Sequence, residues 1–284
     1  MRGYDAGRWL LLATLWSLQF LFMRLAVPVL GSPLVAEARA FFAAAFLVPW
    51  AILAAQRIAP LARWRDHLVI ALANNVLPFL AFAWAANGLP AGYLAIINGT
   101  VPLWTGLFAA ALIGERLGAR RLAGFALGIA GVALIVNLGP VSLEAATILA
   151  ALAALAGAAL WGWAGVLIRQ RMAKLAPIGI AAGSISFAAI LMSPAWVLGP
   201  PPQAWTPEAA AAVIALGLLC SGVAYLPFFT LLRDIGPSRT LSVTFLIPVL
   251  GVLWGWLFLD EAVTVSVLVG AALVLGALGL VLRR

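Results

Sequence analysis

The chain has 284 residues, of which 65% are hydrophobic and only 9% are charged. Because a soluble domain carries about 25% charged residues, this composition excludes a soluble fold. The single cysteine and single histidine exclude an internal disulfide and a histidine-rich metal site, so we expect no metal and no cofactor.

Apolar runs of nearly twenty residues recur along the whole chain, and a helix of about 20 residues spans the ~30 Å hydrocarbon core of a bilayer. The sequence therefore predicts an all-α integral membrane protein with ten transmembrane helices. The predicted segments are 9–29, 34–55, 68–87, 91–114, 120–138, 146–168, 177–199, 209–231, 238–259 and 263–282.

The first segment follows Arg2 and Arg8, as the apolar core of a signal peptide would. Its sequence TLWSLQFLFMR (residues 14–24) is echoed by ALWGWAGVLIR (residues 159–169) in the sixth segment. A cleaved peptide has no reason to share the pattern of an internal helix. We therefore expect residues 9–29 to be the first spanning helix.

A second echo joins the fourth and ninth segments. A glutamate follows a proline by 13 residues in both, at Pro102–Glu115 and at Pro248–Glu261. The two copies are separated by five helices, an odd number, so the second copy enters the membrane from the opposite side. This predicts two inverted five-helix repeats, residues 1–140 and 141–284, in one membrane domain. Inverted repeats are typical of alternating-access transporters, with the substrate near the midplane.

The basic residues predict the orientation. With ten crossings, every Lys and Arg except Arg24 and Arg39 falls on one side of the membrane. An excess of Lys and Arg marks cytoplasmic loops, so we expect both termini in the cytoplasm. The net charge of +8 is explained in the same way, and we expect no nucleic-acid partner.

The chain resembles the drug/metabolite transporter superfamily in its EamA-type ten-helix form. The residues that carry the resemblance are LLATLWSLQFLFMRLA (11–26), EARAFFAAAF (37–46), VPLWTGLFAAALIGERLGARRLAGFALGIAGVALIV (101–136), AALWGWAGVLIRQR (158–171), YLPFFTLLRDIGPS (225–238) and FLIPVLGVLWGWLFLDEAVTVSVLVGAALVLGALGLVL (245–282). Its length and layout are similar to those of bacterial amino-acid exporters, including the branch that exports aromatic amino acids. The resemblance implies export of small metabolites across the bacterial inner membrane and leaves the substrate open.

Polar side chains are costly inside a bilayer and tend to face a cavity or a partner helix. Asn98 and Thr244 are equivalent in the two halves, and each lies four residues before a proline that frees its carbonyl group. We expect the substrate beside them; the alternative is that both prolines only kink helices for packing. The expected substrate-binding residues are Gln19, Asn75, Phe79, Phe82, Asn98, Trp163, Tyr225 and Thr244.

Asn75, Phe79 and Phe82 have a spacing that places them on one helix face. An amide and two aromatic rings suit an amphiphilic or aromatic substrate, or a cation over a ring. The alternative is an aromatic face that contacts lipid or the protein core. Trp163 is expected in the cavity rather than Trp161, because Trp161 is matched by Trp16 in the other half and is expected to be structural.

These features predict a transporter that exports small amphiphilic metabolites, with amino acids as the favoured substrate class. We expect it to act as a monomer or homodimer in the lipid bilayer. Multidrug or cationic-compound efflux is the open alternative. A membrane-embedded enzyme that acts on lipid would need acids or bases positioned together. The sequence shows no paired carboxylates, so we do not expect an enzyme.

The acidic residues bear on energy coupling. Among them, only Glu37 enters a predicted segment, and Arg24 and Arg39 lie at a similar depth. We expect a structural ion pair here rather than a proton relay. This predicts gradient-driven transport with no strict requirement for protons.

Overall fold

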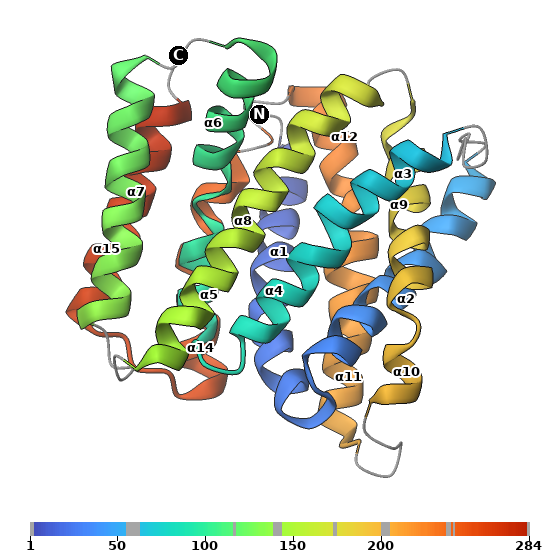
Figure 1. Ribbon diagram of the computed structural model, residues 1–284, viewed down its shortest axis with the longest axis horizontal. Helices are drawn as coiled ribbons and strands as arrows, with labels where there is room; N and C mark the ends of the chain where they lie inside the picture. The colour runs from blue at the N-terminus through green and yellow to red at the C-terminus, as the bar shows by residue number, and fades with distance from the viewer. Residues whose placement is uncertain are drawn as a thin grey trace.

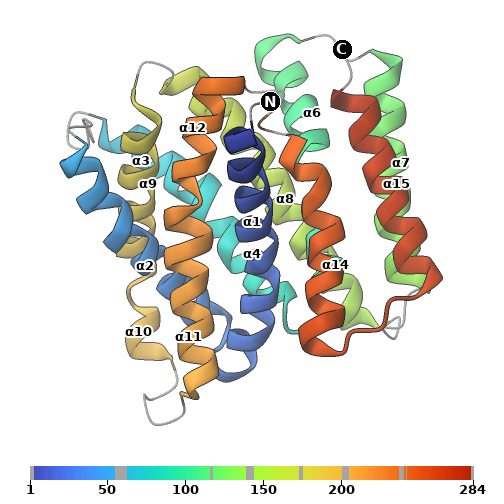
Figure 2. The same ribbon diagram turned by 180° about the vertical axis from the view of Figure 1, so that it is seen from behind.

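The computed structural model describes residues 3–54, 63–115, 118–138, 144–172, 175–199, 205–236, 240 and 242–282. All regular elements in these residues are helices, which confirms the all-α class. Figures 1 and 2 show one bundle in which α1 (Gly3–Leu30) begins and α15 (Val265–Leu282) ends at the same end. We call this end of the bundle the terminal end and the opposite end the far end.

Between these two helices the chain forms a series of further helices, several of them interrupted. They are α2 (Ser32–Leu53), α3 (Trp64–Ile70), η1 (Ala71–Val76), α4 (Leu77–Ala85), α5 (Ala91–Asn98), α6 (Val101–Ile113), α7 (Ala119–Leu138), α8 (Ala145–Arg171), α9 (Pro177–Met192), α10 (Ala195–Leu198), α11 (Pro207–Ala215), η3 (Leu216–Val223), α12 (Tyr225–Ile235), η4 (Ser242–Phe245) and α14 (Leu246–Leu259).

Seven helical stretches in the described part of the chain are long and apolar enough to cross a membrane. They are Tyr4–Leu30, Ser32–Leu53, Trp64–Ala85, Ala91–Ile113, Ala145–Arg171, Pro207–Ile235 and Ser242–Leu259. Three shorter apolar helices accompany them, at Leu122–Val136, Pro177–Met192 and Val265–Leu280.

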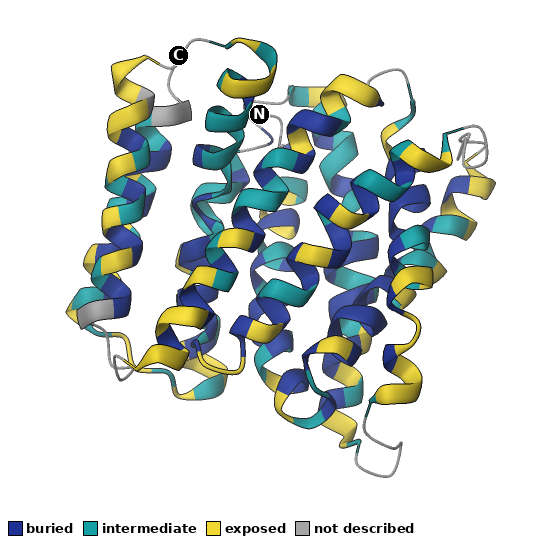
Figure 3. Ribbon diagram, in the orientation of Figure 1, coloured by how far each residue is buried: buried dark blue, intermediate teal, exposed yellow. Residues whose placement is uncertain are grey.

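Large apolar side chains cover the outside of the bundle. Leu53, Val197 and Leu198 are 83%, 86% and 83% exposed. Figure 3 shows exposed positions on outer helices such as α7 and α10, and buried positions toward the centre. A soluble monomer rarely exposes apolar surface on this scale, so the exterior suits hydrocarbon rather than water.

Two interruptions of the helices are π-helical. Ala71–Val76 separates α3 from α4, and Leu216–Val223 separates α11 from α12. The two segments begin at equivalent positions of the predicted repeats. π-Helical turns are rare and occur often at functional sites, and the hydrophobic pattern of the sequence did not predict them.

The two prolines of the sequence echo also lie at interruptions. Gly99 and Thr100 separate α5 from α6, whose first turn contains Pro102, and the 3-10 turn η4 precedes Pro248 in the first turn of α14. A proline cannot donate the hydrogen bond of its own helical turn, because its nitrogen carries no hydrogen.

The two glutamates of the echo follow matching helix ends. Gly114 and Asp260 both adopt the left-handed conformation, with φ of 72° and 52°. The backbone N–H of Glu115 then donates to Ala109 O at 3.3 Å, and that of Glu261 donates to Gly255 O at 3.1 Å. Both caps satisfy a carbonyl that the helix end would otherwise leave unpaired.

Close packing joins α5 to α14 toward the far end. A Cβ atom added to Gly92 would lie 3.1 Å from Val252 Cγ2, and one added to Gly251 would meet the Cβ atom of Ala95. Small residues allow two helices in a membrane to approach this closely. The crossing brings the second half of the chain against the first.

Candidate functional site

The helices enclose a central cavity of about 510 Å³, within the range of about 300–1,000 Å³ that is usual for small-molecule sites. Both halves of the chain contribute to its wall. The lining residues are Trp16, Gln19, Arg39, Asn74, Asn75, Phe79, Asn98, Val101, Trp161, Gly165, Ile168, Arg169, Met172, Leu175, Pro177, Ile180, Ala181, Ser184, Ile185, Cys220, Ser221, Tyr225, Phe228, Phe229, Leu232, Thr244 and Ile247.

The cavity extends toward the terminal end of the bundle. Arg169, Met172 and Leu175, at the end of α8 and directly after it, belong to its wall, and Figure 1 shows that α8 ends at the terminal end. Residues nearer the far end, such as Leu34 and Leu89, are almost fully buried and do not line the cavity. The cavity therefore faces one side of the bundle.

Arg39, on the second helix, is the most unusual residue of the wall, since it is only 5% exposed. Its Nε donates to Ser221 Oγ at 2.7 Å, and its Nη2 donates to Gln19 Oε1 at 2.8 Å. The guanidinium carbon lies 3.9 Å from the ring centroid of Phe79. Side chains from three other helical segments thus hold the Arg39 guanidinium group in the wall of the cavity.

Six of the eight predicted substrate-binding residues line this cavity. They are Gln19, Asn75, Phe79, Asn98, Tyr225 and Thr244. Asn98 and Thr244, the two residues placed by the prolines, therefore meet at one cavity although they come from different halves of the chain.

Phe82 and Trp163 do not line the cavity. Phe82 is fully buried, and its ring stacks on Trp161 at 4.8 Å between centroids. A Cβ atom added to Gly157 of α8 would lie 2.8 Å from the Phe82 ring. Phe82 thus fills the space over this glycine, while Trp163 packs against a small cluster around Ala164 and Leu167.

The expectation that Trp163 rather than Trp161 faces the cavity is not met. Trp161 lies in the wall, and its Nε1 donates to the backbone oxygen of Asn74 in the π-helical segment at 2.9 Å. Its repeat partner Trp16 lines the same cavity. The recurrence of this tryptophan in both halves therefore marks two positions of the cavity wall.

The expected ion pair at Glu37 is wrong. Glu37 Oε1 accepts a hydrogen bond from Trp196 Nε1 at 3.0 Å, and Glu37 does not line the cavity. Arg39 bonds to Gln19 and Ser221 instead. The physical reason is helix geometry: residues two apart point about 200° away from each other.

Two arginine–glutamate pairs lie at opposite ends of the bundle. Arg24 Nε lies 3.7 Å from Glu261 Oε1, and Arg169 Nη1 lies 2.7 Å from Glu115 Oε1. In the first pair, an arginine of the first predicted helix contacts a glutamate of the second half. In the second pair, an arginine of the sixth predicted helix contacts a glutamate of the first half. α6 ends at the terminal end and α14 ends at the far end (Figures 1 and 2).

The Glu261 carboxylate also caps α5. Its Oε1 accepts from the backbone N–H of Ala91 at 2.7 Å, and its Oε2 accepts from that of Gly92 at 3.2 Å. A negative charge at a helix N-terminus is stabilised by the unpaired N–H groups there. This carboxylate, which directly follows α14, therefore links α14 to the N-terminus of α5 at the far end of the bundle.

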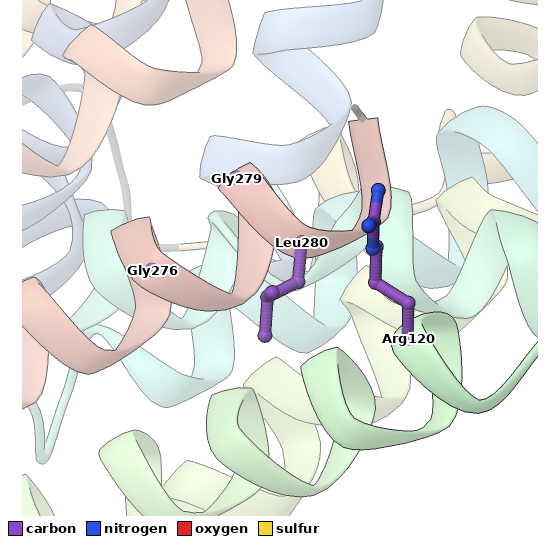
Figure 4. A pocket seen from close by; sticks show the side chains of 4 residues that line it. All are labelled: Arg120, Gly276, Gly279 and Leu280. Carbon is purple, nitrogen blue, oxygen red and sulfur yellow. The ribbon is translucent and has the colours of Figure 1, made fainter. Parts of the chain in front are cut away.

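A second recess, of about 380 Å³, lies between α7 and α15 and is lined by Arg120, Gly276, Gly279 and Leu280. Figure 4 shows Arg120 extending from α7 alongside α15. One arginine among two glycines and a leucine gives no set of convergent polar groups to orient a ligand. We therefore place the functional site in the central cavity.

Among the wall residues that the predicted site did not include, Arg39 and Trp161 make the most specific contacts. The signal for Arg39 was present, because an arginine within a predicted spanning segment marks a functional site by default. No group of three or more His, Cys, Asp or Glu that suits a metal ion occurs in the described residues.

The fold and the cavity define a class: a helical membrane protein whose two halves line one cavity. The model of the EamA-like transporter family matches residues 8–137 and again residues 148–283. The chain belongs to this family, and it is accordingly a multi-pass membrane transporter rather than an enzyme.

Several known proteins are similar to the chain. The uncharacterized transporter YvbV of Bacillus subtilis (strain 168) is 28% identical over 220 residues, which cover 77% of this chain and 72% of that protein. The probable terminal-alkyne amino-acid exporter of Streptantibioticus cattleyicolor is 27% identical over 204 residues, covering 71% and 67%. One solved crystal structure has a TM-score of 0.67 at 22% identity, covering 99% and 98% of the two chains, which shows likeness of fold alone.

Proposed function

We propose that the protein exports small amphiphilic metabolites, most of all amino acids, by alternating access through the central cavity. The observation that carries this proposal is a cavity of suitable size whose wall comes from both halves and which extends toward one end only. The exporter among the relatives, named for an amino acid, supports the substrate class.

The proposed architecture is ten spanning helices in two inverted repeats, residues 1–140 and 141–284. The family model matches each half once, and the three shorter apolar helices supply the spans beyond the seven longer ones. The paired π-helical segments and the crossed arginine–glutamate pairs also support a repeat. The functional unit is a monomer or a homodimer.

The proposed orientation places the terminal end in the cytoplasm of a bacterial cell, with the protein in the inner membrane. The distribution of Lys and Arg in the sequence supports it. A cavity that extends toward the terminal end would then load its substrate from the cytoplasm, as export requires.

Efflux of cationic compounds is the less favoured alternative. The charged residues among those that line the cavity are Arg39 and Arg169. Arg169 is paired with Glu115, whereas Arg39 is buried and would repel a cationic ligand, because the Coulomb energy of like charges grows as the local dielectric constant falls.

Transport by the purified protein in proteoliposomes tests the proposal. Vesicles preloaded with one of a panel of amino acids should release it faster than empty-membrane controls. Gly165→Trp should stop the flux, because Gly165 lines the cavity and its added Cβ has no atom within 4 Å. Gly106→Trp is the matched control, since Gly106 has the same open surroundings and does not line the cavity. Flux no faster than in protein-free vesicles for the entire panel would refute the proposal.

A further inference from the structure

We propose that Arg39 and Asn75 form an anion subsite that binds the carboxylate of the transported molecule. That the bound molecule is transported rests on the proposed function. The subsite itself rests on the geometry of the cavity. It assigns a charge to the substrate: an acid, with or without an amino group, is bound, and a compound that is only cationic is rejected.

The orientation of the Arg39 side chain is fixed before any ligand arrives. Gln19 donates its Nε2 to the backbone oxygen of Trp16 at 2.7 Å, which turns its Oε1 toward Arg39. Ser221 accepts from Arg39 Nε, and the Phe79 ring packs on the guanidinium plane at 3.9 Å. These contacts use two of the three guanidinium nitrogens and leave Nη1, which is buried without a hydrogen-bond partner.

The charge of Arg39 has no counter-ion in the part of the chain that the structure describes. Its side-chain partners are a serine hydroxyl and a glutamine carbonyl, both neutral. The cavity-lining residues include no aspartate or glutamate, and Arg169, the other charged lining residue, is already paired with Glu115. Buried charges in proteins are normally paired, because an unpaired one is strongly unfavourable. The missing partner is therefore an anion that enters the cavity.

Asn75 supplies a second donor to the same cavity. It is only 2% exposed, and its Oδ1 accepts from Asn74 Nδ2 at 3.3 Å. Its Nδ2 is buried without a partner. Asn75 lies one turn before Phe79, the residue whose ring packs on Arg39. Two unpartnered donors, one of them charged, fit a group that has two acceptor oxygens and no donor, which describes a carboxylate.

A matched ligand series tests the subsite by binding, independently of flux. The probes are leucine, phenylalanine and tryptophan, each compared with its carboxamide, which lacks the negative charge, and with the corresponding acid that lacks the amino group. Affinity is measured on the purified protein by ligand-induced thermal stabilisation. We expect the acids with and without the amino group to bind at least tenfold more tightly than the carboxamides.

Three variants locate the effect. Arg39→Gln should lower carboxylate affinity at least tenfold and abolish the preference over the carboxamide, whereas Arg39→Lys should keep the preference at reduced affinity. Arg233→Gln is the charge-matched control, because Arg233 is 78% exposed and pairs with Asp234 outside the cavity; it should bind as the wild type does. If Arg39→Gln fails to fold, the test rests on the preference of the wild type for acids over carboxamides and on the affinity of Arg39→Lys for the same ligands.

The outcomes separate this inference from the proposed function. Carboxylate-selective binding without flux in proteoliposomes would support the subsite and refute the transport function. Flux with equal affinity for acid and carboxamide, or with an Arg39→Gln variant that binds acids as tightly as the wild type, would overturn the subsite alone. Failure of every carboxylate in the series to bind would also overturn the subsite.

Discussion

Replacement of Glu261 by glutamine should shift the protein toward a state that is open at the far end. In the structure this carboxylate accepts hydrogen bonds from the first two N–H groups of α5, at 2.7 and 3.2 Å, and lies 3.7 Å from Arg24. In the proposed alternating-access cycle, opening of the far end would separate α5 from the end of α14. Glutamine keeps the shape of the side chain, loses its charge and presents an N–H₂ group to one of the two donors.

The size of the shift follows from these contacts. A hydrogen bond to a charged group contributes about 1.5–3 kcal/mol, and a charge at a helix N-terminus contributes about 0.3–1 kcal/mol. The Glu261 side chain is only 14% exposed, so solvent screens these terms little. A glutamine that retains one of the two bonds should therefore destabilise the closed far end by about 2 kcal/mol, which changes the ratio of the two states by roughly 30-fold.

Spin-label distance measurement in proteoliposomes is the assay. Gly88 precedes α5, Val263 follows α14, and both are exposed; cysteines at these two positions in a Cys220→Ala background would carry the labels. We expect Glu261→Gln to add a population at longer distance. Glu208→Gln removes a charge of the same sign from an exposed site on α11 and should leave the distribution unchanged.

An unchanged distance distribution in a folded Glu261→Gln protein would refute the reasoning, because the carboxylate would then not hold the far end closed. A longer distance in both variants would show that the added population reflects net charge rather than the helix cap. Either result would remove the support that this contact gives to alternating access.

Three further outcomes are expected. Gly251→Ala should lower the unfolding temperature measured in detergent, because overpacking costs about 1–3 kcal/mol. Gly106→Ala should not lower it, because Gly106 has open surroundings. Equal unfolding temperatures for the two variants would contradict the close helix crossing. Trp161→Phe should raise the KM of transport, and Trp163→Phe should leave it unchanged, because only the first tryptophan lines the cavity; the reverse order would place the wall elsewhere. Transport down a substrate gradient should persist without a pH difference and in Glu37→Gln, and flux that returns only with an imposed proton gradient would show proton coupling.

The sequence predicted the cavity residues best where a physical constraint acts on the backbone. A proline removes a helical hydrogen bond wherever it stands, so the positions four residues earlier, Asn98 and Thr244, were identified without any knowledge of packing. Both line the cavity. The helical spacing that joined Asn75 and Phe79 to Phe82 describes one helix alone, and it contained no information about Gly157, over which the Phe82 ring packs.

The two tryptophans show a different limit. Trp161 and Trp163 lie two residues apart on one helix, so only one of them can face the cavity. The repeat partner Trp16 was taken as a sign of structural packing, yet both repeated residues line the cavity. In a protein whose site lies between two halves, a residue that recurs in both halves marks the shared wall as readily as a packing contact.

The two ends of the bundle differ in a way that links the site to the transport cycle. At the far end the Arg24–Glu261 side chains are 30% and 14% exposed, whereas at the terminal end the Arg169–Glu115 side chains are 67% and 35% exposed. The two pairs are chemically alike, and they differ in how far their surroundings exclude water. Desolvation strengthens the Coulomb attraction of such a pair, and it acts more on the far-end pair, while the terminal-end pair has the shorter separation, 2.7 Å against 3.7 Å. In a cycle that exchanges the roles of the two halves, closure of the terminal end would bury Arg169–Glu115 while opening of the far end hydrates Arg24–Glu261. In such a cycle the Coulomb energy lost at one end would be largely regained at the other, which would keep the two states close in free energy and would leave the proposed anion at Arg39 to move down its own gradient.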